Sequence, residues 1–451
     1  MAKARTVHVC ESCGHTTPGW LGRCPGCGAW NALVEQVASG GSARASGPAP
    51  RPVGTSKALP ITQVAQGEGG EVRLRVGMGE LDRVLGGGLV TGALVLLGGD
   101  PGVGKSTLLL MAMQAFARRG VRVLYVSGEE SARQVRLRAE RLGASSDELW
   151  LLAETGLDAV EAAVDQVKPR VLVLDSVQTL HSPELDGVPG SIGQVRQVAN
   201  AAMKLSKGRD LATFLVGHVT KEGSLAGPRV LEHLVDTVLY FEGDGSTSLR
   251  VLRATKNRFG STGEIGMFEM REEGLAEVPD ASARLLQERL PDAAGTAVTC
   301  TMEGTRPVLV EVQALVGRPT QGTPARTAVG VDRGRLAMLL AVLGKCGLDL
   351  SDRDVFVSVA GGLRVQEPGV DLAIAAAIVS SARGVPLPEQ RLWFGEVGLV
   401  GELRGTSQPL ARLREAERHG FREATVPASV PREGASLRIF AARTLGDALF
   451  G

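Results

Sequence analysis

Eight consecutive residues have the types and the spacing that hold the phosphates of a nucleotide. Gly99-Asp100-Pro101-Gly102-Val103-Gly104-Lys105-Ser106 matches the pattern G-x-x-x-x-G-K-[ST] at every fixed position, and Thr107 follows it. Glycines let backbone N–H groups turn toward phosphate oxygens, and a helix N-terminus adds a positive dipole end. Lys105 would reach the β- and γ-phosphates, and Ser106 would hold Mg²⁺. We therefore predict an ATP site here rather than a glycine-rich turn that binds nothing.

Alternating strands and helices are expected to position this loop. An apolar run at 93–97 precedes it, and a helical pattern at 106–118 follows it. Further strands are expected at 122–126, 149–153, 171–174 and 212–216, with helices at 131–142, 157–167 and 192–206. This alternation predicts a parallel sheet with helices on both faces, whose ligands bind at the carboxyl ends of the strands.

Polar side chains follow several of these strands. Asp175 comes after the strand at 171–174, the usual place of an acid that holds Mg²⁺ through water. Glu129 and Glu130 end a neighbouring strand, where one carboxylate can activate the attacking water. The other is expected to cap the following helix, and the pattern does not say which is which. His218, at another strand end, is either a sensor of the γ-phosphate or an ordinary hydrogen-bonded histidine.

A pair of cations lies in a later, antiparallel part of the chain. Strands are expected at 237–242, 249–254 and 266–271, and Lys256-Asn-Arg-Phe-Gly260 lies between the last two. Lys256 and Arg258 are either solvated edge charges or cations that reach a neighbouring subunit's nucleotide. In the second case they would neutralise charge that develops on the γ-phosphoryl group.

Four of the six cysteines lie within the first 27 residues. They form two C-x-x-C pairs, Cys10 with Cys13 and Cys24 with Cys27. Four thiolates at this spacing are typical of a closed tetrahedral Zn²⁺ site, whose role is structural. A segment this short cannot bury a core of its own, so metal binding would supply its folding energy. The alternative is a pair of redox dithiols.

Composition limits the class of protein without identifying it. The length of 451 residues favours about three domains. The net charge is +1, so any binding of nucleic acid must use a local patch or channel. We expect a cytoplasmic protein, because no early segment has the apolar centre of a signal peptide and no apolar run is long enough to span a bilayer. Residues 38–57, rich in Gly, Ser, Ala and Pro, are expected to form a flexible tether.

The order of these motifs resembles the bacterial RadA (Sms) family of DNA repair proteins. Val126-Ser-Gly-Glu-Glu-Ser131, Gly217-His-Val-Thr-Lys-Glu-Gly223 and above all Lys256-Asn-Arg-Phe-Gly260 are similar to that family's sequence. The resemblance implies an α/β protein with a zinc ribbon or knuckle at 1–37, a linker at 38–58, a RecA-like P-loop ATPase core at 59–280 and a Lon-protease-like α+β domain at 285–451.

The resemblance also implies an activity and partners. Members of the family are expected to be DNA-dependent ATPases that form hexameric rings and act in homologous recombination by branch migration. The implied partners are single-stranded DNA, recombination intermediates and a RecA-type recombinase. Lys256 and Arg258 then act in trans, and residues 220–228, with Lys221, are a candidate DNA-contacting loop rather than an ordinary surface loop.

The C-terminal third resembles the proteolytic domain of Lon but lacks its catalytic pair. Lon-type peptidases use a serine activated by a later lysine, whereas Gly369 stands at the serine's position and no lysine follows Lys345. We expect a non-proteolytic scaffold with a basic surface, to which Arg383, Arg391, Arg404, Arg412 and Arg414 would contribute. The alternatives for the whole chain are an ATP-dependent Lon-class protease and a KaiC-like signalling ATPase or autokinase.

Overall fold

The computed structural model describes residues 5–10, 16–25, 28, 30–31, 33–38, 73–217, 229–243, 248–319, 322–431 and 434–450. Cys13, Cys27, His218, the loop at 220–228 and residues 39–57 of the predicted tether lie outside this part of the chain, whereas Ala38 is the last residue of a strand. The chain divides into two compact units, one of residues 1–78, 87–240 and 256–260, the other of residues 79–86, 241–255 and 261–451.

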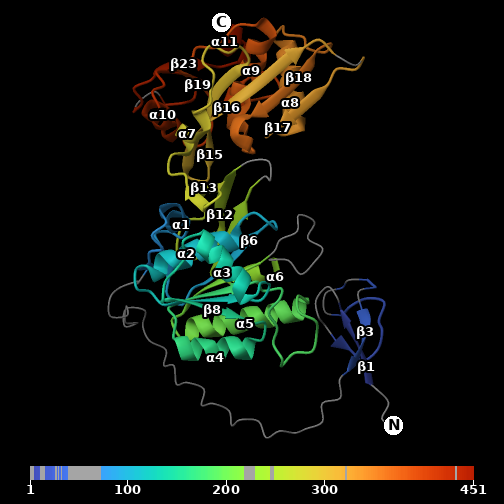
Figure 1. The fold of residues 1–451 in the computed structure, drawn as a ribbon. Helices are drawn as coiled ribbons and strands as arrows, with labels where there is room; N and C mark the ends of the chain where they lie inside the picture. The colour runs from blue at the N-terminus through green and yellow to red at the C-terminus, as the bar shows by residue number, and fades with distance from the viewer. Residues whose placement is uncertain are drawn as a thin grey trace, which may run out of the picture. The chain divides into compact units, whose positions relative to one another are not determined.

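The first unit is built on a mostly parallel sheet (Figure 1). Its strands run in the order β11 (Thr237–Glu242), β6 (Leu94–Gly99), β10 (Ala212–Val216), β9 (Val171–Asp175), β7 (Val123–Ser127) and β8 (Leu149–Ala153). The last five pair in parallel. Every residue of β6, β7, β9 and β10 is buried, as expected where helices cover both faces. The predicted sheet is therefore confirmed.

Helices cover this sheet in two layers (Figure 1). Helices α4 (Leu157–Val167) and α5 (Ile192–Gly208) lie on one face, where their apolar side chains form one cluster with alternate residues of the strands, such as Leu172 and Leu174. Helices α2 (Lys105–Ala117) and α3 (Ala132–Arg141) lie on the other face. The short elements of this unit are α6 (Arg229–Glu232), β4 (Arg73–Leu74) and β5 (Leu89–Val90). Helix α1 (Gly79–Val84) belongs to the second unit.

The second unit combines an antiparallel ribbon with a seven-stranded mixed sheet. The ribbon is formed by β12 (Leu249–Asn257), β13 (Ile265–Arg271) and β14 (Gly274–Glu277). The larger sheet has the order β17 (Arg326–Val329), β18 (Asp354–Val359), β16 (Arg306–Gly317), β15 (Thr296–Glu303), β19 (Arg391–Trp393), β22 (Glu423–Pro427) and β23 (Arg438–Ala442).

Helix α9 (Asp371–Arg383) forms much of the core beneath this sheet, with ten consecutive buried residues, Asp371 to Ser380. The remaining elements are α7 (Ala281–Leu286), α8 (Arg333–Lys345), α10 (Pro409–Arg418), α11 (Leu445–Phe450), β20 (Glu396–Val397) and β21 (Leu403–Arg404). This mixture of helices and a mixed sheet is the predicted α+β architecture.

An ion pair between buried Arg412 and partly buried Glu367 lies beside the position of the missing serine. Gly369 is buried, and a Cβ added there would lie 3.4 Å from Nη1 of Arg412. Arg412 is fully buried and donates to both carboxylate oxygens of Glu367, at 2.6 and 2.7 Å. The prediction that Arg412 adds to a basic surface is wrong, because its guanidinium neutralises an acid inside the unit.

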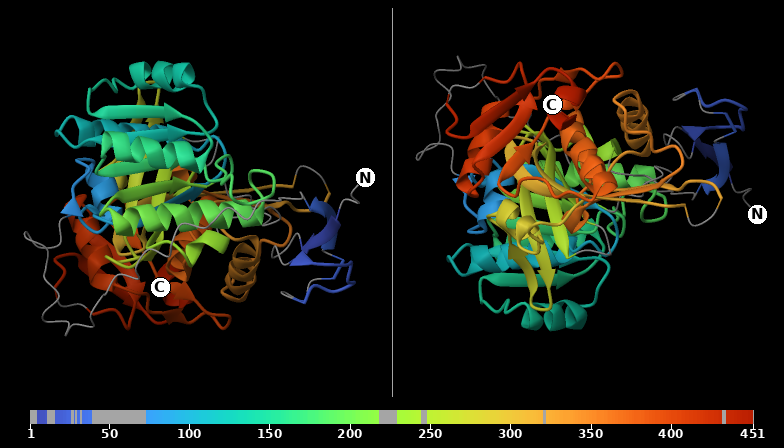
Figure 2. Two further views of the ribbon diagram at one scale, coloured as in Figure 1. Left: turned by 90° about the horizontal axis from the view of Figure 1, so that it is seen from below. Right: turned by 90° about the horizontal axis from the view of Figure 1, so that it is seen from above.

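The N-terminal segment forms a small antiparallel sheet (blue in Figures 1 and 2). Its strands are β1 (Arg5–Cys10), β2 (Thr16–Thr17) and β3 (Leu33–Ala38), in the order β2-β1-β3. Within the described parts of the chain, no helix has both the length and the apolar composition that crossing a bilayer requires.

Candidate functional site

The phosphate loop joins β6 to α2 with a backbone that only glycine adopts readily. Gly102 and Gly104 have φ angles of 77° and 111°, in the left-handed region. Gly104 is also the N-cap of α2, and no side chain caps the helix there. The first N–H groups of α2 are therefore available to bind an anionic group such as a phosphate. Asp100, Pro101 and Val103 occupy the loop between these glycines, and Thr107 follows in the first turn of the helix.

Lys105 is buried in the loop with its ammonium surrounded by oxygens. Its Nζ donates to the carbonyl oxygens of Gly99 at 2.8 Å and Asp100 at 3.0 Å. Burial lowers the pKa of Lys105, and the charges of Asp175, Glu129 and Asp100 act in the opposite direction. The predicted lysine and acids are thus brought close enough to interact electrostatically.

Tyr125, which sequence reasoning missed, lies beside the two predicted magnesium ligands. This side chain on β7 is only 2% exposed, and its hydroxyl donates to Oδ2 of Asp175 at 2.5 Å. The Ser106 side chain lies close enough to the Tyr125 hydroxyl to lower its pKa slightly. Burial, followed by the charge of Asp175, raises the pKa of Tyr125 well above its usual value, so the phenol stays protonated and donates. The one feature of the sequence that could have pointed to Tyr125 is the expected strand order, which places β7 beside β9 and therefore Tyr125 near Asp175.

The two glutamates have different surroundings. Glu129 accepts a hydrogen bond from Oγ of Ser176, the residue after Asp175, and its charge acts on Lys105. Glu130 instead pairs with Arg138 of α3 at 2.5 Å. The prediction that a glutamate caps α3 is wrong, because Ser131 is the N-cap and forms a reciprocal capping box with Gln134.

The backbone at Gly128 passes close to Thr179, and this brings the next residue, Glu129, near the end of β9. A Cβ added at Gly128 would lie 2.4 Å from Oγ1 of Thr179, so only glycine fits. The Gly128 N–H donates to the carbonyl of Asp175 at 2.7 Å, and the N–H of Glu130 donates to Oγ of Ser127 at 3.1 Å. The turn after β7 is therefore attached to the end of β9.

Lys256 and Arg258 lie at the other end of β6. Asp236 is the anchor: its Oδ2 accepts the N–H of Leu94, the first residue of β6, at 3.1 Å, and its Oδ1 accepts Nη1 of Arg258 at 3.0 Å. Lys256 Nζ donates to the carbonyl oxygens of Glu232 and Val235 at 2.6 and 2.8 Å. Burial and the neighbouring Arg258 cation lower the pKa of Lys256.

The phosphate loop starts at the carboxyl end of β6, Gly99. At about 3.3 Å per residue, this strand separates the two ends by roughly 17 Å. The structure therefore places Lys256 and Arg258 away from the loop of their own chain.

The described cysteines of the N-terminal segment lie together. Cys10 and Cys24, one from each C-x-x-C pair, are 1% and 2% exposed and form a small cluster with Leu33. Buried thiols that converge from two knuckles are a donor set that suits Zn²⁺. Cys13 and Cys27, the second residue of each pair, lie outside the described residues.

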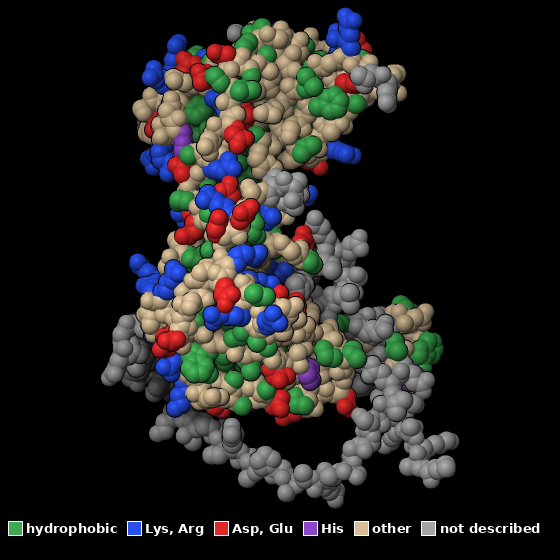
Figure 3. Space-filling model, in the orientation of Figure 1, with side chains coloured by type: hydrophobic (Ala, Val, Ile, Leu, Met, Phe, Trp, Pro, Cys, Tyr) green, Lys and Arg blue, Asp and Glu red, His purple; other side chains and the backbone are tan. Residues whose placement is uncertain are grey.

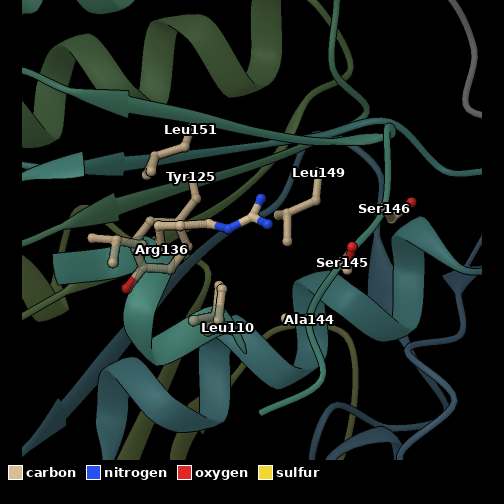
Figure 4. Close-up of a pocket in the computed structure, with 10 residues that line it drawn as sticks. Leu110, Tyr125, Arg136, Ala144, Ser145, Ser146, Leu149 and Leu151 are labelled. Carbon is tan, nitrogen blue, oxygen red and sulfur yellow. The ribbon is translucent and has the colours of Figure 1, made fainter. Parts of the chain in front are cut away.

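A small cavity adjoins the site but does not contain the phosphate loop. Its volume is about 140 Å³, and it lies among β7, β8, α2 and α3 (Figure 4). Tyr125, Leu110, Leu149 and Leu151 form its largely apolar wall, and Arg136 reaches across it (Figure 4). Because no residue of 99–107 lines it, this cavity is not the candidate nucleotide site.

Comparisons with known proteins match each part of the chain. A family model described as an AAA domain matches residues 77–224, and one described as a rubredoxin metal binding domain matches residues 8–35. A third, described as subunit ChlI of Mg-chelatase, matches residues 311–430. Among solved structures, a KaiC-like protein from Pyrococcus horikoshii is 21% identical and covers 46% of this chain and 99% of its own, at a TM-score of 0.39.

Curated relatives match almost the whole chain. The DNA repair protein RadA of Bacillus subtilis is 48% identical over 431 residues, which are 95% of this chain and 94% of that protein. The DNA repair protein RadA of Listeria monocytogenes is 46% identical over 100% of this chain and 99% of that protein. The phosphate-loop core makes the chain an ATP hydrolase. Identity at this level and over this length shows that the chain belongs to the RadA family of DNA repair proteins.

Proposed function

We propose that the chain is a DNA-stimulated ATPase motor that acts in homologous recombination. It moves the branch points of recombination intermediates as a ring, with single-stranded DNA in contact with the subunits. The observation that supports this most directly is the position of Lys256 and Arg258 at the amino end of β6. A cation pair that lies away from its own phosphate loop can stabilise a γ-phosphoryl group only if that group belongs to a neighbouring subunit's nucleotide.

The residues around the loop take distinct roles in this proposal. The backbone N–H groups of residues 99–107 other than Pro101, together with the Lys105 side chain, bind the phosphates, while Ser106 and Asp175 hold the hydrated Mg²⁺ that screens their charge. Glu129 orients and deprotonates the attacking water, because Glu130 is neutralised by Arg138. Lys256 and Arg258 of the adjacent subunit stabilise the charge that develops on the γ-phosphoryl group.

The other parts of the chain complete the assembly. We propose that Cys10, Cys13, Cys24 and Cys27 bind a structural Zn²⁺ and that this ribbon takes part in recruiting a RecA-type recombinase. We keep the predicted domain boundaries as part of the proposal: 1–37, 38–58, 59–280 and 285–451. The last domain would serve as a non-proteolytic scaffold of a cytoplasmic hexamer. The Glu367–Arg412 ion pair beside Gly369 supports this, since neither residue is a nucleophile poised beside a base.

The proposed activity predicts that single-stranded DNA raises ATP turnover of the purified chain several-fold, because strand contacts organise the shared sites. The same preparation should move the branch point of a three-strand recombination intermediate only when ATP is hydrolysed. Phosphate release and gel-resolved strand products measure the two effects. Turnover that ignores DNA, together with an immobile branch point, would contradict the proposal.

The surroundings of the two glutamates predict unequal effects of the same substitution. Glu129→Gln should lower ATP turnover by about 100-fold or more, the usual effect of losing a general base, and leave nucleotide binding intact. Glu130→Gln removes only an ion pair with Arg138 and should change turnover by no more than a few-fold. Single-turnover hydrolysis with a parallel nucleotide-binding titration separates the two. Equal losses in both variants would disprove the assignment.

The Tyr125 hydroxyl predicts a magnesium phenotype. Tyr125→Phe removes the donor to Asp175, and the Mg²⁺ concentration for half-maximal turnover should rise about 10-fold, the usual effect of losing a group that orients a metal ligand. Tyr240→Phe is the matched control, because Tyr240 is the chain's only other tyrosine and donates to Glu232 instead, at 3.2 Å. If the two variants show the same Mg²⁺ dependence, Tyr125 does not position the acid.

A further inference from the structure

Two tryptophans of the N-terminal segment are exposed although tryptophan is usually well buried. Trp20 is 58% exposed and Trp30 is 72% exposed, and Leu21 beside them is 46% exposed. Figure 3 shows hydrophobic side chains at the surface of this segment. The chain has four tryptophans, and Trp393, in the second unit, is only 3% exposed. Leaving two large rings in water forfeits burial energy, so these rings are candidates for contact with another molecule.

The backbone holds the two rings near the same point. The N–H of Asn31 donates to the carbonyl of Gly22 at 2.9 Å, and Arg23 and Trp30 form an antiparallel bridge. A Cβ added at Gly22 would lie 3.7 Å from Cη2 of Trp20 and 4.0 Å from Cζ3 of Trp30. Gly22 has no side chain to fill this space. The edges of both rings therefore border an open position on the surface.

A cation accompanies the rings. Cζ of Arg23 lies 5.7 Å from the centroid of the Trp30 ring, and Nε of Arg23 donates to the carbonyl of Gly28 at 3.0 Å. Residues 16–34 contain this arginine and no aspartate or glutamate. We define Trp20, Arg23 and Trp30 as the aromatic platform.

We propose that the aromatic platform stacks unpaired bases of single-stranded nucleic acid. Every base has a π-face that an indole ring can cover, and an arginine adds a cation–π contribution and attracts the phosphate backbone. The absence of acidic residues in 16–34 favours a phosphate-linked ligand over a basic peptide. The inference rests on the proposed DNA-dependent function and adds to it a specific binding site in the N-terminal segment that carries the cysteine pairs.

The knuckle around Cys24 connects this platform to the predicted Zn²⁺ site. The N–H of Gly28 donates to the carbonyl of Cys24 at 2.8 Å, which closes the turn between Arg23 and Trp30. A metal held by Cys24 would keep this turn closed and hold the two tryptophans in place. The platform is therefore tested in the full-length, zinc-loaded chain.

The test measures the affinity of the full-length chain for oligo(dT) of about 20 nucleotides by fluorescence anisotropy. Trp20→Ala and Trp30→Ala should each weaken binding by about 10-fold, and the phenylalanine variants should recover most of it, since a smaller ring still stacks. Trp150→Ala is the matched control: Trp150 is also exposed, at 42%, but lies on β8. Zinc content and circular dichroism confirm that each variant is folded.

Two further measurements separate stacking from charge. Trp→Ala variants should keep the wild-type slope of log affinity against log salt, because no phosphate contact is lost, whereas Arg23→Ala should make the slope shallower by about 0.7. An abasic oligonucleotide of equal length should bind the wild type and both tryptophan variants alike.

Opposite results would overturn the inference in two distinguishable ways. If the wild type binds oligo(dT) and both Trp→Ala variants bind it as tightly, the platform does not stack bases and the proposed function stands without it. If the wild type does not bind the oligonucleotide at all, the proposed DNA-dependent function fails and the platform's role fails with it.

Discussion

Strand β6 imposes the constraint on which the rest of the structure depends. Its carboxyl end, Gly99, begins the phosphate loop, and the N–H of its first residue, Leu94, is bound by Asp236. The same carboxylate holds Arg258, so the cation pair is attached to the opposite end of the strand. A buried strand cannot shorten, so under the proposed function one subunit would carry two halves of different active sites. Ring formation, in this account, follows from that separation.

The candidate nucleotide site at the carboxyl ends of the strands is organised by polar side-chain contacts as well as by the phosphate loop. Tyr125 donates to Asp175 and Ser176 donates to Glu129, so the ends of β7 and β9 are connected at one edge of the sheet. Buried hydrogen bonds of this kind are costly to break, because each leaves an unsatisfied polar atom. The arrangement keeps the acids near Lys105 in fixed positions, which is the preorganisation that phosphoryl transfer requires.

Much of this fold follows from local pattern in the sequence. The strands at 149–153 and 212–216 and the helix at 157–167 have the predicted limits, because short apolar runs and a longer amphipathic pattern differ clearly in length. The capping box of Ser131 and Gln134, which replaces the expected glutamate cap, is a local signal. Contacts between residues that are distant in the sequence are harder to predict from local pattern. No local pattern reveals that Glu130 pairs with Arg138, eight residues further along and about two turns into α3. Likewise, the burial of Arg412 depends on Glu367, 45 residues away.

The most direct test of the central claim mixes two inactive variants. Lys105→Ala removes the cation of the phosphate loop, and Lys256→Ala removes the cation proposed to act on the neighbour. Neither variant should hydrolyse ATP alone. If the cation acts in trans, an equal mixture should recover turnover at roughly a quarter of its interfaces, those that join an intact loop to an intact Lys256. Sustained inactivity at every mixing ratio, in oligomers shown to exchange subunits, would contradict the account.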